Sequence, residues 1–212
     1  MFYKVFTRIL DIIISIFAII IFSPLMIFVA IAIKLESKGP IFADVPHRVG
    51  LHYRPFRFYK FRSMIVNAHN IIREDPKYKK LYDEYRNNNY KLENDPRVTG
   101  VGRFIRKYSI DEIPQFFNVF LGDMSLVGPR AYYFDELEFY IKSNPAYKND
   151  IVEITNIKPG ITGVWQISGR SKISFDKRIA IDLEYSRSKS IRKNLIILFK
   201  TPFAVLSKKG AY

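Results

Sequence analysis

The chain contains no cysteine and only three histidines among its 212 residues. The absence of cysteine excludes disulfides, thiolate metal sites and cysteine nucleophiles, and it is compatible with a reducing compartment. His47, His52 and His69 lack the spacing of metal ligands, so we expect them at surface or loop positions. The sequence therefore indicates neither a zinc site nor a Ser/His/Asp triad.

Acidic residues are also scarce: the chain has 20 of them and 34 basic residues, which gives a net charge of +14. Such an excess favours anionic partners and leaves nucleic acid, acidic lipid headgroups and phosphorylated substrates open. The glycines form no phosphate-binding fingerprint, since their spacing in segment 158–171 (KPGITGVWQISGRS) is too irregular. That segment predicts a turn-rich connection.

One long apolar run covers residues 12–33 and is interrupted only by Ser15, Ser23 and Pro24. A straight helix of this length would reach about 33 Å, enough for a bilayer core of about 30 Å. Pro24 removes a backbone donor, so the helix should kink or break near Ser23. Basic residues flank both ends, which leaves little positive-inside asymmetry. A re-entrant helix-break-helix and a kinked span both fit, whereas a cleaved signal peptide does not, because no small-residue cleavage site follows.

Two adjacent carboxylates, Asp111 and Glu112, follow a basic cluster that includes Arg106. Ser109 and Glu112 have the spacing of a capping box, and a helix start at Asp111 is the alternative that suits Pro114 better. Either start puts both acids at a helix N-terminus, where the dipole keeps a carboxylate ionised and attracts phosphate. An ionised aspartate beside arginine and a divalent ion can accept a phosphoryl group. Acids in a first helical turn are, however, also common without any catalytic role.

Aromatic and basic residues alternate between Phe56 and Arg62, which predicts a short strand or hairpin arm. Such a stripe can stack nucleic-acid bases, or it can be a half-buried strand whose basic side faces headgroups. We also expect an exposed helix and loop over the site in residues 68–92, and helices in residues 132–141 and 176–185.

The C-terminal region carries apolar residues at helical spacing, flanked by lysine and arginine. An amphipathic helix of this kind lies in a membrane interface or packs against the protein body, and the sequence leaves both open. The residues concerned are Leu195, Leu198, Phe199, Pro202, Phe203 and Leu206.

Two long segments, 95–115 (DPRVTGVGRFIRKYSIDEIPQ) and 122–130 (GDMSLVGPR), strongly resemble the bacterial sugar transferases, which are monotopic phosphoglycosyl transferases. Segments 48–50 (RVG), 60–64 (KFRSM) and 158–171 extend the resemblance over most of the chain. It favours re-entry, since a Ser-Pro pair such as Ser23-Pro24 breaks the membrane helix in this family. The chain departs from the family pattern at residues 43–47 and at Ala131, where a second proline is usual.

The resemblance implies transfer of a sugar 1-phosphate from a UDP-sugar to polyprenyl (undecaprenyl) phosphate, the first membrane step of a glycoconjugate or polysaccharide pathway. It implies that Asp111 attacks the sugar-bearing phosphate and that UMP leaves with its charge carried by Mg²⁺. The lipid phosphate then attacks the aspartyl phosphosugar. Asp111 and Glu112 would be the metal ligands, and Glu112 would alternatively assist the acceptor.

The substrate phosphates are expected at Arg106, Arg130 and Pro129, because a guanidinium pairs bidentately with phosphate oxygens. The fold is expected to be α+β, mostly helical with a small irregular β element. Residues 1–38 would form the re-entrant membrane helix, and residues 39–212 a catalytic domain with interfacial helices on the cytoplasmic face of the bacterial inner membrane.

We expect the compact form of the family, without the multi-span N-terminal domain of larger relatives. Membrane lipid is an expected partner and nucleic acid is not, while homo-oligomerisation stays open. The alternative is a non-enzymatic, membrane-tethered basic protein that binds nucleic acid or acidic lipid.

Overall fold

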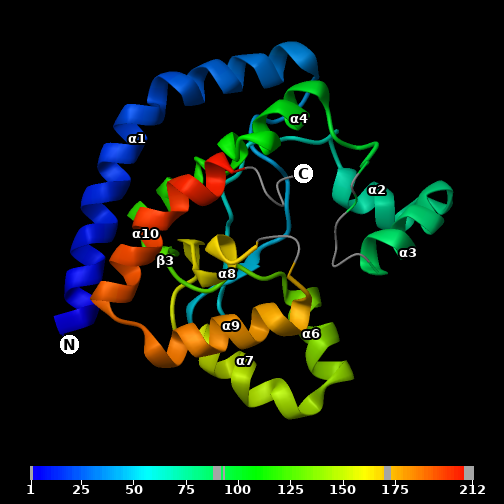
Figure 1. Cartoon of the computed structure of the whole chain (residues 1–212). Helices are drawn as coiled ribbons and strands as arrows, with labels where there is room; N and C mark the ends of the chain where they lie inside the picture. Colours follow the sequence, from blue (N-terminus) through cyan, green and yellow to red (C-terminus); the bar gives the residue numbers. More distant parts are fainter. Residues whose placement is uncertain (1, 88–91, 93, 170–172, 208–212) are drawn as a thin grey trace.

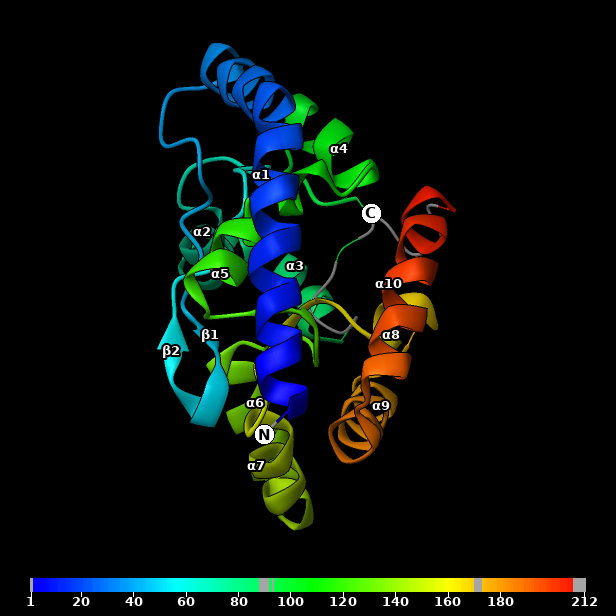
Figure 2. The same ribbon diagram turned by 90° about the vertical axis from the view of Figure 1, so that its left-hand side faces the viewer.

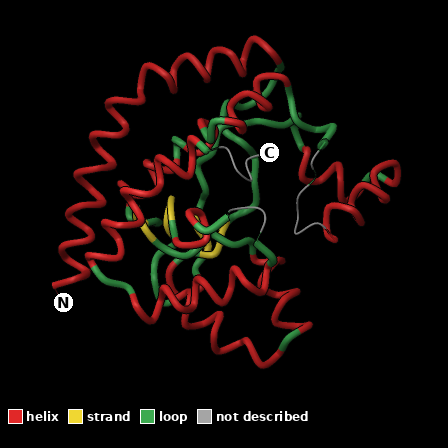
Figure 3. Tube along the Cα trace, in the orientation of Figure 1, coloured by secondary structure: helices red, strands yellow, loops and turns green. Residues whose placement is uncertain are grey.

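Helices make up most of the protein in the computed structural model, which describes residues 2–87, 92, 94–169 and 173–207 (Figures 1 and 3). The α-helices are α1 (Phe2–Glu36), α2 (Ala68–Glu74), α3 (Lys79–Asn87), α4 (Gly100–Lys107), α5 (Gln115–Leu121), α6 (Phe134–Ser143), α7 (Lys148–Thr155), α8 (Val164–Ile167), α9 (Phe175–Ser188) and α10 (Ile191–Leu206). Short 3₁₀ turns are η1 (Leu51–Tyr53), η2 (Pro76–Tyr78), η3 (Ile110–Glu112) and η4 (Pro145–Tyr147).

The β structure of the described residues consists of two small sheets. Strands β1 (Arg48–Val49) and β2 (Pro55–Phe56) pair antiparallel, and β3 (Ser125–Val127) and β4 (Gly160–Thr162) pair parallel. The prediction of a mostly helical protein with a small β element is therefore confirmed.

Strand β4 corrects the interpretation of segment 158–171 as a turn-rich connection. The amide of Ser125 donates to the carbonyl of Pro159, and the amide of Gly128 donates to that of Thr162. These bonds join distant parts of the chain, so the local periodicity of the sequence does not predict β4. Residues 170–171 of the segment lie outside the described residues.

Helix α1 is bent but continuous through Pro24 (Figure 1). Proline cannot donate to the carbonyl four residues before it, which is that of Ile20. The hydroxyl of Ser23 donates to this same carbonyl at 2.8 Å. The Ser-Pro pair thus bends the helix while satisfying the freed acceptor, so the predicted kink is confirmed and the alternative, a break between two helices, is not observed. Among the described helices, α1 alone is long and apolar enough to cross a membrane.

Both ends of α1 contact the rest of the protein. Near its start, the Arg8 guanidinium donates to the carbonyl of Val119 at 2.6 Å, at the C-terminal end of α5. At its far end, a carboxylate oxygen of Glu36 accepts from the amide of Val101 in α4 at 2.9 Å. In Figure 2, α1 stands between α5 and α10. The helix therefore lies along the body rather than projecting from it.

The predicted helices in residues 132–141 and 176–185 are confirmed as α6 and α9, which pack with α7 around a buried cluster that includes Leu137, Ile151 and Ile179. Helices α2 and α3 lie in the segment 68–87. Part of the predicted loop that follows, residues 88–91 and 93, lies outside the described residues.

Helix α10 packs against the body, which is one of the two roles that the sequence left open, and it leaves its other face exposed. Its inner face packs against the body, with Ile197 only 2% exposed and Leu198 against the core formed by β3 and its neighbours. Its outer face presents Leu195, Phe199, Phe203 and Leu206 as exposed apolar side chains. The helix is thus anchored by one side and has an apolar surface on the other.

Candidate functional site

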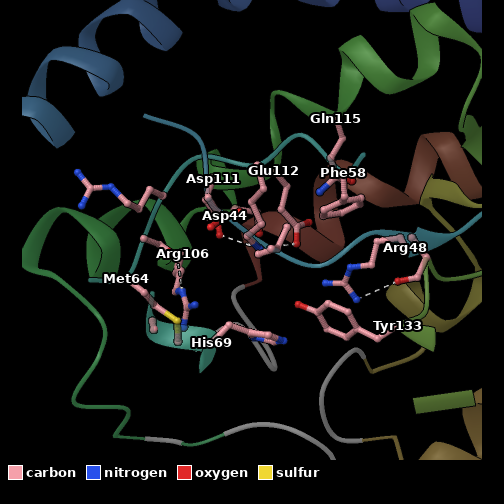
Figure 4. Close-up of a pocket in the computed structure, with 18 of the residues that line it drawn as sticks. Asp44, Arg48, Phe58, Met64, His69, Arg106, Asp111, Glu112, Gln115 and Tyr133 are labelled. Carbon is pink, nitrogen blue, oxygen red and sulfur yellow. Dashed lines mark hydrogen bonds and ion pairs between the residues drawn. The ribbon is translucent and has the colours of Figure 1, made fainter. Parts of the chain in front are cut away.

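A cavity of about 300 Å³ collects residues from segments that are far apart in the sequence. Its wall is formed by the loop 40–48, the segment 58–69, α4, η3, residues 130–136 and α8. Figure 4 shows Asp111 and Glu112 pointing between Arg106 on one side and Arg48 with Tyr133 on the other. The volume suits a small-molecule site.

Asp111 and Glu112 lie in the 3₁₀ turn η3 and not at the start of an α-helix. Ser109, the residue before the turn, has a left-handed backbone (φ 56°), and its side chain makes no capping hydrogen bond. The predicted capping box is therefore wrong, and a three-residue turn carries little macrodipole. The charge of Asp111, which is only 2% exposed, must be stabilised by other groups.

Lys60 supplies that stabilisation. Its Nζ lies 2.8 Å from Oδ2 of Asp111 and 3.3 Å from Oε1 of Glu112. Burial raises the pKa of the Asp111 carboxyl, and the Lys60 ammonium opposes this. Burial also acts to lower the pKa of Lys60, but the two carboxylates raise it by more, so its net shift is upward. The net shift of the Asp111 pKa is upward, and the ammonium 2.8 Å away favours the ionised form against burial. A poorly hydrated carboxylate in such a pair is a good nucleophile once Lys60 moves away.

Lys60 was not among the predicted site residues, because its segment was interpreted as a half-buried strand whose basic side faces headgroups. The only available signal was its place in the family-like segment 60–64.

Arg106 lines the cavity as predicted. Its Nε donates to the hydroxyl of Ser63 at 2.8 Å. Gly102, one turn earlier in α4, permits this contact, since a Cβ there would lie 1.9 Å from the Ser63 carbonyl oxygen. Arg106 takes part in none of the salt bridges between described residues, so its charge is available to an anionic ligand.

Arg130 also lines the cavity, and its terminal nitrogen lies 3.8 Å from a carboxylate oxygen of Glu136. Its backbone amide donates to the buried carboxylate of Asp182 on α9 at 3.0 Å. Pro129 was also expected at the substrate phosphates, but it does not line the cavity. Its carbonyl accepts from the Gly160 amide at 2.9 Å, so it joins the β3 loop to β4.

Arg48 is a second cation that the sequence analysis did not assign to the site. It is buried, and its guanidinium carbon lies 3.1 Å from the centre of the Tyr133 ring. It also donates to the carbonyl of Ala131, at the position where the family usually has proline. Like Arg106, Arg48 forms no salt bridge within the described part of the chain. Lys60, Arg48, Arg106 and Arg130 together make the cavity suited to a polyanion.

His69 was predicted at a surface or loop position, but it is half-buried on α2 and lines the cavity. Burial and the charges of Arg73 and Arg48 lower its pKa to about 4. The imidazole is therefore neutral at pH 7 and does not add to the positive charge of the site.

The stripe from Phe56 to Arg62 does not form a surface for stacking bases. Phe56 and Phe61 are 7% and 2% exposed, and Arg62 is buried. The Arg62 guanidinium donates to backbone carbonyls of the loop after α1, including that of Pro40 at 2.7 Å. These contacts do not support the nucleic-acid alternative, which requires accessible aromatic faces.

The donor set for a metal consists of two carboxylates. Among the described residues, no group of three or more histidine, aspartate or glutamate side chains could hold a metal ion. Magnesium, however, is usually bound by one or two carboxylates together with substrate phosphates. Asp111 and Glu112, which share one cation in Lys60, fit that kind of site.

Comparison with known proteins agrees with this chemistry. The family model described as bacterial sugar transferase matches residues 2–208. The chain is 43% identical over 209 residues to the undecaprenyl-phosphate galactose phosphotransferase of Salmonella typhimurium, covering 97% of this chain and 41% of that protein. It is 40% identical over 206 residues to the exopolysaccharide production protein ExoY of Sinorhizobium fredii, covering 97% of this chain and 87% of the relative.

A third relative is the UDP-glucose:undecaprenyl-phosphate glucose-1-phosphate transferase of Klebsiella pneumoniae, 40% identical over 216 residues, which cover 98% of this chain and 42% of that protein. The chain thus spans less than half of the Salmonella and Klebsiella relatives and most of the Sinorhizobium one. With nearly its whole length matched, the chain belongs to the bacterial sugar transferase family.

Proposed function

We propose that this protein transfers a sugar 1-phosphate from a UDP-sugar to undecaprenyl phosphate and releases UMP. The observation that carries the proposal is the buried carboxylate of Asp111, held 2.8 Å from Lys60 in a cavity that Arg48, Arg106 and Arg130 also line. The names of the Salmonella and Klebsiella relatives describe this class of transfer for those proteins. The reaction begins a glycoconjugate or polysaccharide pathway.

In the first step, a carboxylate oxygen of Asp111 attacks the sugar-bearing phosphorus of the donor. The bond from that phosphorus to the bridging oxygen breaks, and UMP leaves with the oxygen and its electron pair. Asp111 then carries the phosphosugar as an acyl phosphate. In the second step, an oxygen of the lipid phosphate attacks the same phosphorus, and the Asp111 carboxylate is regenerated. Dividing the transfer in this way lets one nucleophile serve two substrates that arrive separately.

The cations around Asp111 and Glu112, the carboxylate dyad, have separate tasks in this proposal. Lys60 keeps Asp111 ionised before substrate binds, and it moves to the phosphate oxygens when the donor arrives. Arg106 and Arg130 hold the diphosphate in line with Asp111, because fixed positive charge aimed at the developing anion lowers the barrier. Asp111 and Glu112 would hold Mg²⁺ together with the substrate phosphates. When bound, the metal would neutralise charge on the leaving phosphate.

The same proposal includes a monotopic arrangement at the cytoplasmic face of the inner membrane. A helix that crossed the bilayer would put its two ends on opposite sides. Arg8 and Glu36, near the two ends of α1, both contact the body that carries the cavity. The bend at Ser23-Pro24 allows this, and the exposed faces of α1 and α10 are apolar. An enzyme embedded in one leaflet meets a lipid phosphate at the depth of the headgroups.

The test is to mix purified full-length protein with Mg²⁺ and a panel of UDP-sugars, without lipid acceptor. We expect one UMP per protein molecule and a phosphosugar mass on the peptide that contains Asp111. Asp111→Asn should abolish both signals, because an amide keeps the shape of the side chain and removes the nucleophilic charge. Glu112→Gln should slow UMP release by a factor on the order of a hundred to ten thousand.

Lys107→Gln is the matched control, since it removes a positive charge from an exposed position of α4 next to Arg106. It should leave UMP release within about twofold of the native protein, because exposed charges contribute little. Robust turnover by Asp111→Asn, or UMP that appears only when the lipid acceptor is present, would show direct transfer and refute the role of Asp111.

A further inference from the structure

The cavity continues past Arg130 to α8, where two neighbouring side chains line it. Gln166 is only 9% exposed, and its Oε1 has no hydrogen-bond partner among the described residues. The indole Nε1 of Trp165 is likewise buried without a partner in the described part of the protein. A buried polar atom left unpaired is unfavourable. Two such atoms, on consecutive residues that both line the cavity, point to a ligand that supplies the missing bonds.

The chemistry of these two side chains specifies the ligand further. The indole offers one donor, and the glutamine amide offers an acceptor, Oε1, and a donor, Nε2. Together they present a donor, an acceptor and a donor. The Watson–Crick edge of uracil presents the complementary set, namely an acceptor oxygen, the N3–H donor and a second acceptor oxygen. Cytosine presents an acceptor at N3 and an amino donor beside it, so it matches this pair only if the Gln166 amide turns by about 180°.

The position of α8 agrees with the place of the nucleoside in the transfer. Asp111 attacks the outer phosphorus, so the uridine lies one phosphate farther from Asp111. Arg130 connects the two ends of the cavity, because its guanidinium carbon lies 5.4 Å from the centre of the Trp165 ring. Burial acts to lower the pKa of Arg130, but Glu136 and, more weakly, Glu112 raise it, so its net shift is upward and Arg130 is also within electrostatic range of Glu112. If a phosphate of the donor nucleotide lies at Arg130, its base lies next to α8.

We propose that Trp165 and Gln166 recognise the uracil base of the donor nucleotide. Oε1 of Gln166 accepts the uracil N3–H, and the Gln166 amide group and the Trp165 indole donate to the two uracil oxygens. The assignment rests on the proposed function for the identity of the leaving nucleotide. It makes α8 the element that selects uridine nucleotides, whereas the Asp111 end of the cavity carries out the chemistry.

The experiment measures binding of UMP, CMP and N3-methyl-UMP to the purified full-length protein by calorimetry, so no turnover is needed. The native protein should bind UMP roughly ten- to a hundredfold more tightly than N3-methyl-UMP, because the methyl group leaves Oε1 of Gln166 unpaired. CMP should also bind more weakly than UMP, because it requires the Gln166 amide to turn; equal binding of CMP would show that α8 does not select uridine. Gln166→Leu should weaken UMP binding and bring UMP and N3-methyl-UMP to nearly equal affinity. Trp165→Phe keeps a ring and removes one donor, so UMP should bind roughly two- to tenfold more weakly.

Ser168→Ala is the control, since Ser168 is exposed, follows α8 and does not line the cavity. It should bind all three nucleotides as the native protein does. The methylated nucleotide probes the native protein itself, so a Gln166 variant that fails to fold does not remove the test.

Equal binding of UMP and N3-methyl-UMP by the native protein would overturn the inference. So would a folded Gln166→Leu that keeps the full preference for UMP, even if the transfer reaction proceeds as proposed. If the base preferences follow the expectation and no UDP-sugar yields UMP, the uracil site stands and the proposed transfer fails.

Discussion

The ammonium of Lys60 lies 2.8 Å from a carboxylate oxygen of Asp111, and this ion pair is nearly closed to water on the Asp111 side, where the side chain is 3% exposed. Burial alone would favour the neutral acid, and Lys60 counters it. The reactivity of the proposed nucleophile is therefore set by a residue from a distant segment of the chain.

Lys60→Gln should raise the pKa of Asp111 further, because burial would then act with less compensation. The variant should release UMP on the order of a hundredfold more slowly at pH 7. Its rate should recover in part as the pH rises and Asp111 ionises, whereas the native rate should change less over the same range. A pH profile of UMP release checks this. A uniform loss at every pH would mean that Lys60 acts only on the substrate.

Asp182 should make the stability of the native protein fall between pH 4 and pH 6. Burial raises its pKa to about 6, against 3.8 for an unperturbed aspartate, so the folded protein binds a proton that the unfolded chain has released. Folding is favoured below this window, and the contribution is lost as the pH rises through it, by about 3 kcal/mol. The measurement is the melting temperature at pH 4.5 and pH 7 in detergent.

Asp182→Asn should lack that pH dependence, because an amide does not titrate there. The amide oxygen can still accept from the Arg130 backbone amide and from the Tyr132 hydroxyl, so the loop after β3 that carries Arg130 should keep its place. If the native and variant melting temperatures change in parallel between the two pH values, Asp182 does not titrate in this window.

The bend in α1 should keep both of its ends on the cytoplasmic side. The chain has no cysteine, so Lys4→Cys and Lys38→Cys each provide a single thiol at an exposed position. Neither should react with an impermeant thiol reagent in intact cells, and both should react after lysis. Labelling of one site alone in intact cells would reveal a true span.

Pro24→Leu restores the amide that can donate to Ile20, so it should straighten α1 and move the N-terminus outward in part of the population. Ser23→Ala tests the other member of the pair. It leaves the Ile20 carbonyl without the Ser23 hydroxyl, and it should lower the melting temperature in detergent while the topology stays the same.

The outer face of α10 should lie in the membrane interface. A fluorophore on Phe199→Cys or Phe203→Cys should be quenched by lipids that carry a quencher in the acyl chain, since these positions are 73% and 63% exposed and apolar. Arg192→Cys, at an exposed basic position near the start of the helix, is the control and should be quenched less. Equal, weak quenching at all three positions would place α10 away from the bilayer.

The amino-acid sequence by itself determined the features that depend on neighbouring residues. Helical spacing of apolar residues gave α10, and the proline within a long apolar run gave the bend of α1. Asp111, Glu112, Arg106 and Arg130 were found because they stand in contiguous segments, 95–115 and 122–130, that resemble a known family. All four line the cavity. Local sequence could name these residues, since the resemblance does not require knowing what they touch.

Only the tertiary structure decided which residues surround Asp111. Lys60 and Arg48 reach the cavity from segments more than fifty positions before the dyad in the printed sequence, and the pairing of β3 with β4 sets the loop that carries Arg130. The electrostatics changed for the same reason. A helix dipole is a local property, and it was predicted from the capping pattern. The chain instead forms a short 3₁₀ turn after Ser109, and the positive charge beside Asp111 comes from Lys60, which long-range packing brings to it. Contacts between distant segments are chosen by the burial of side chains across the whole fold, which no window of sequence contains.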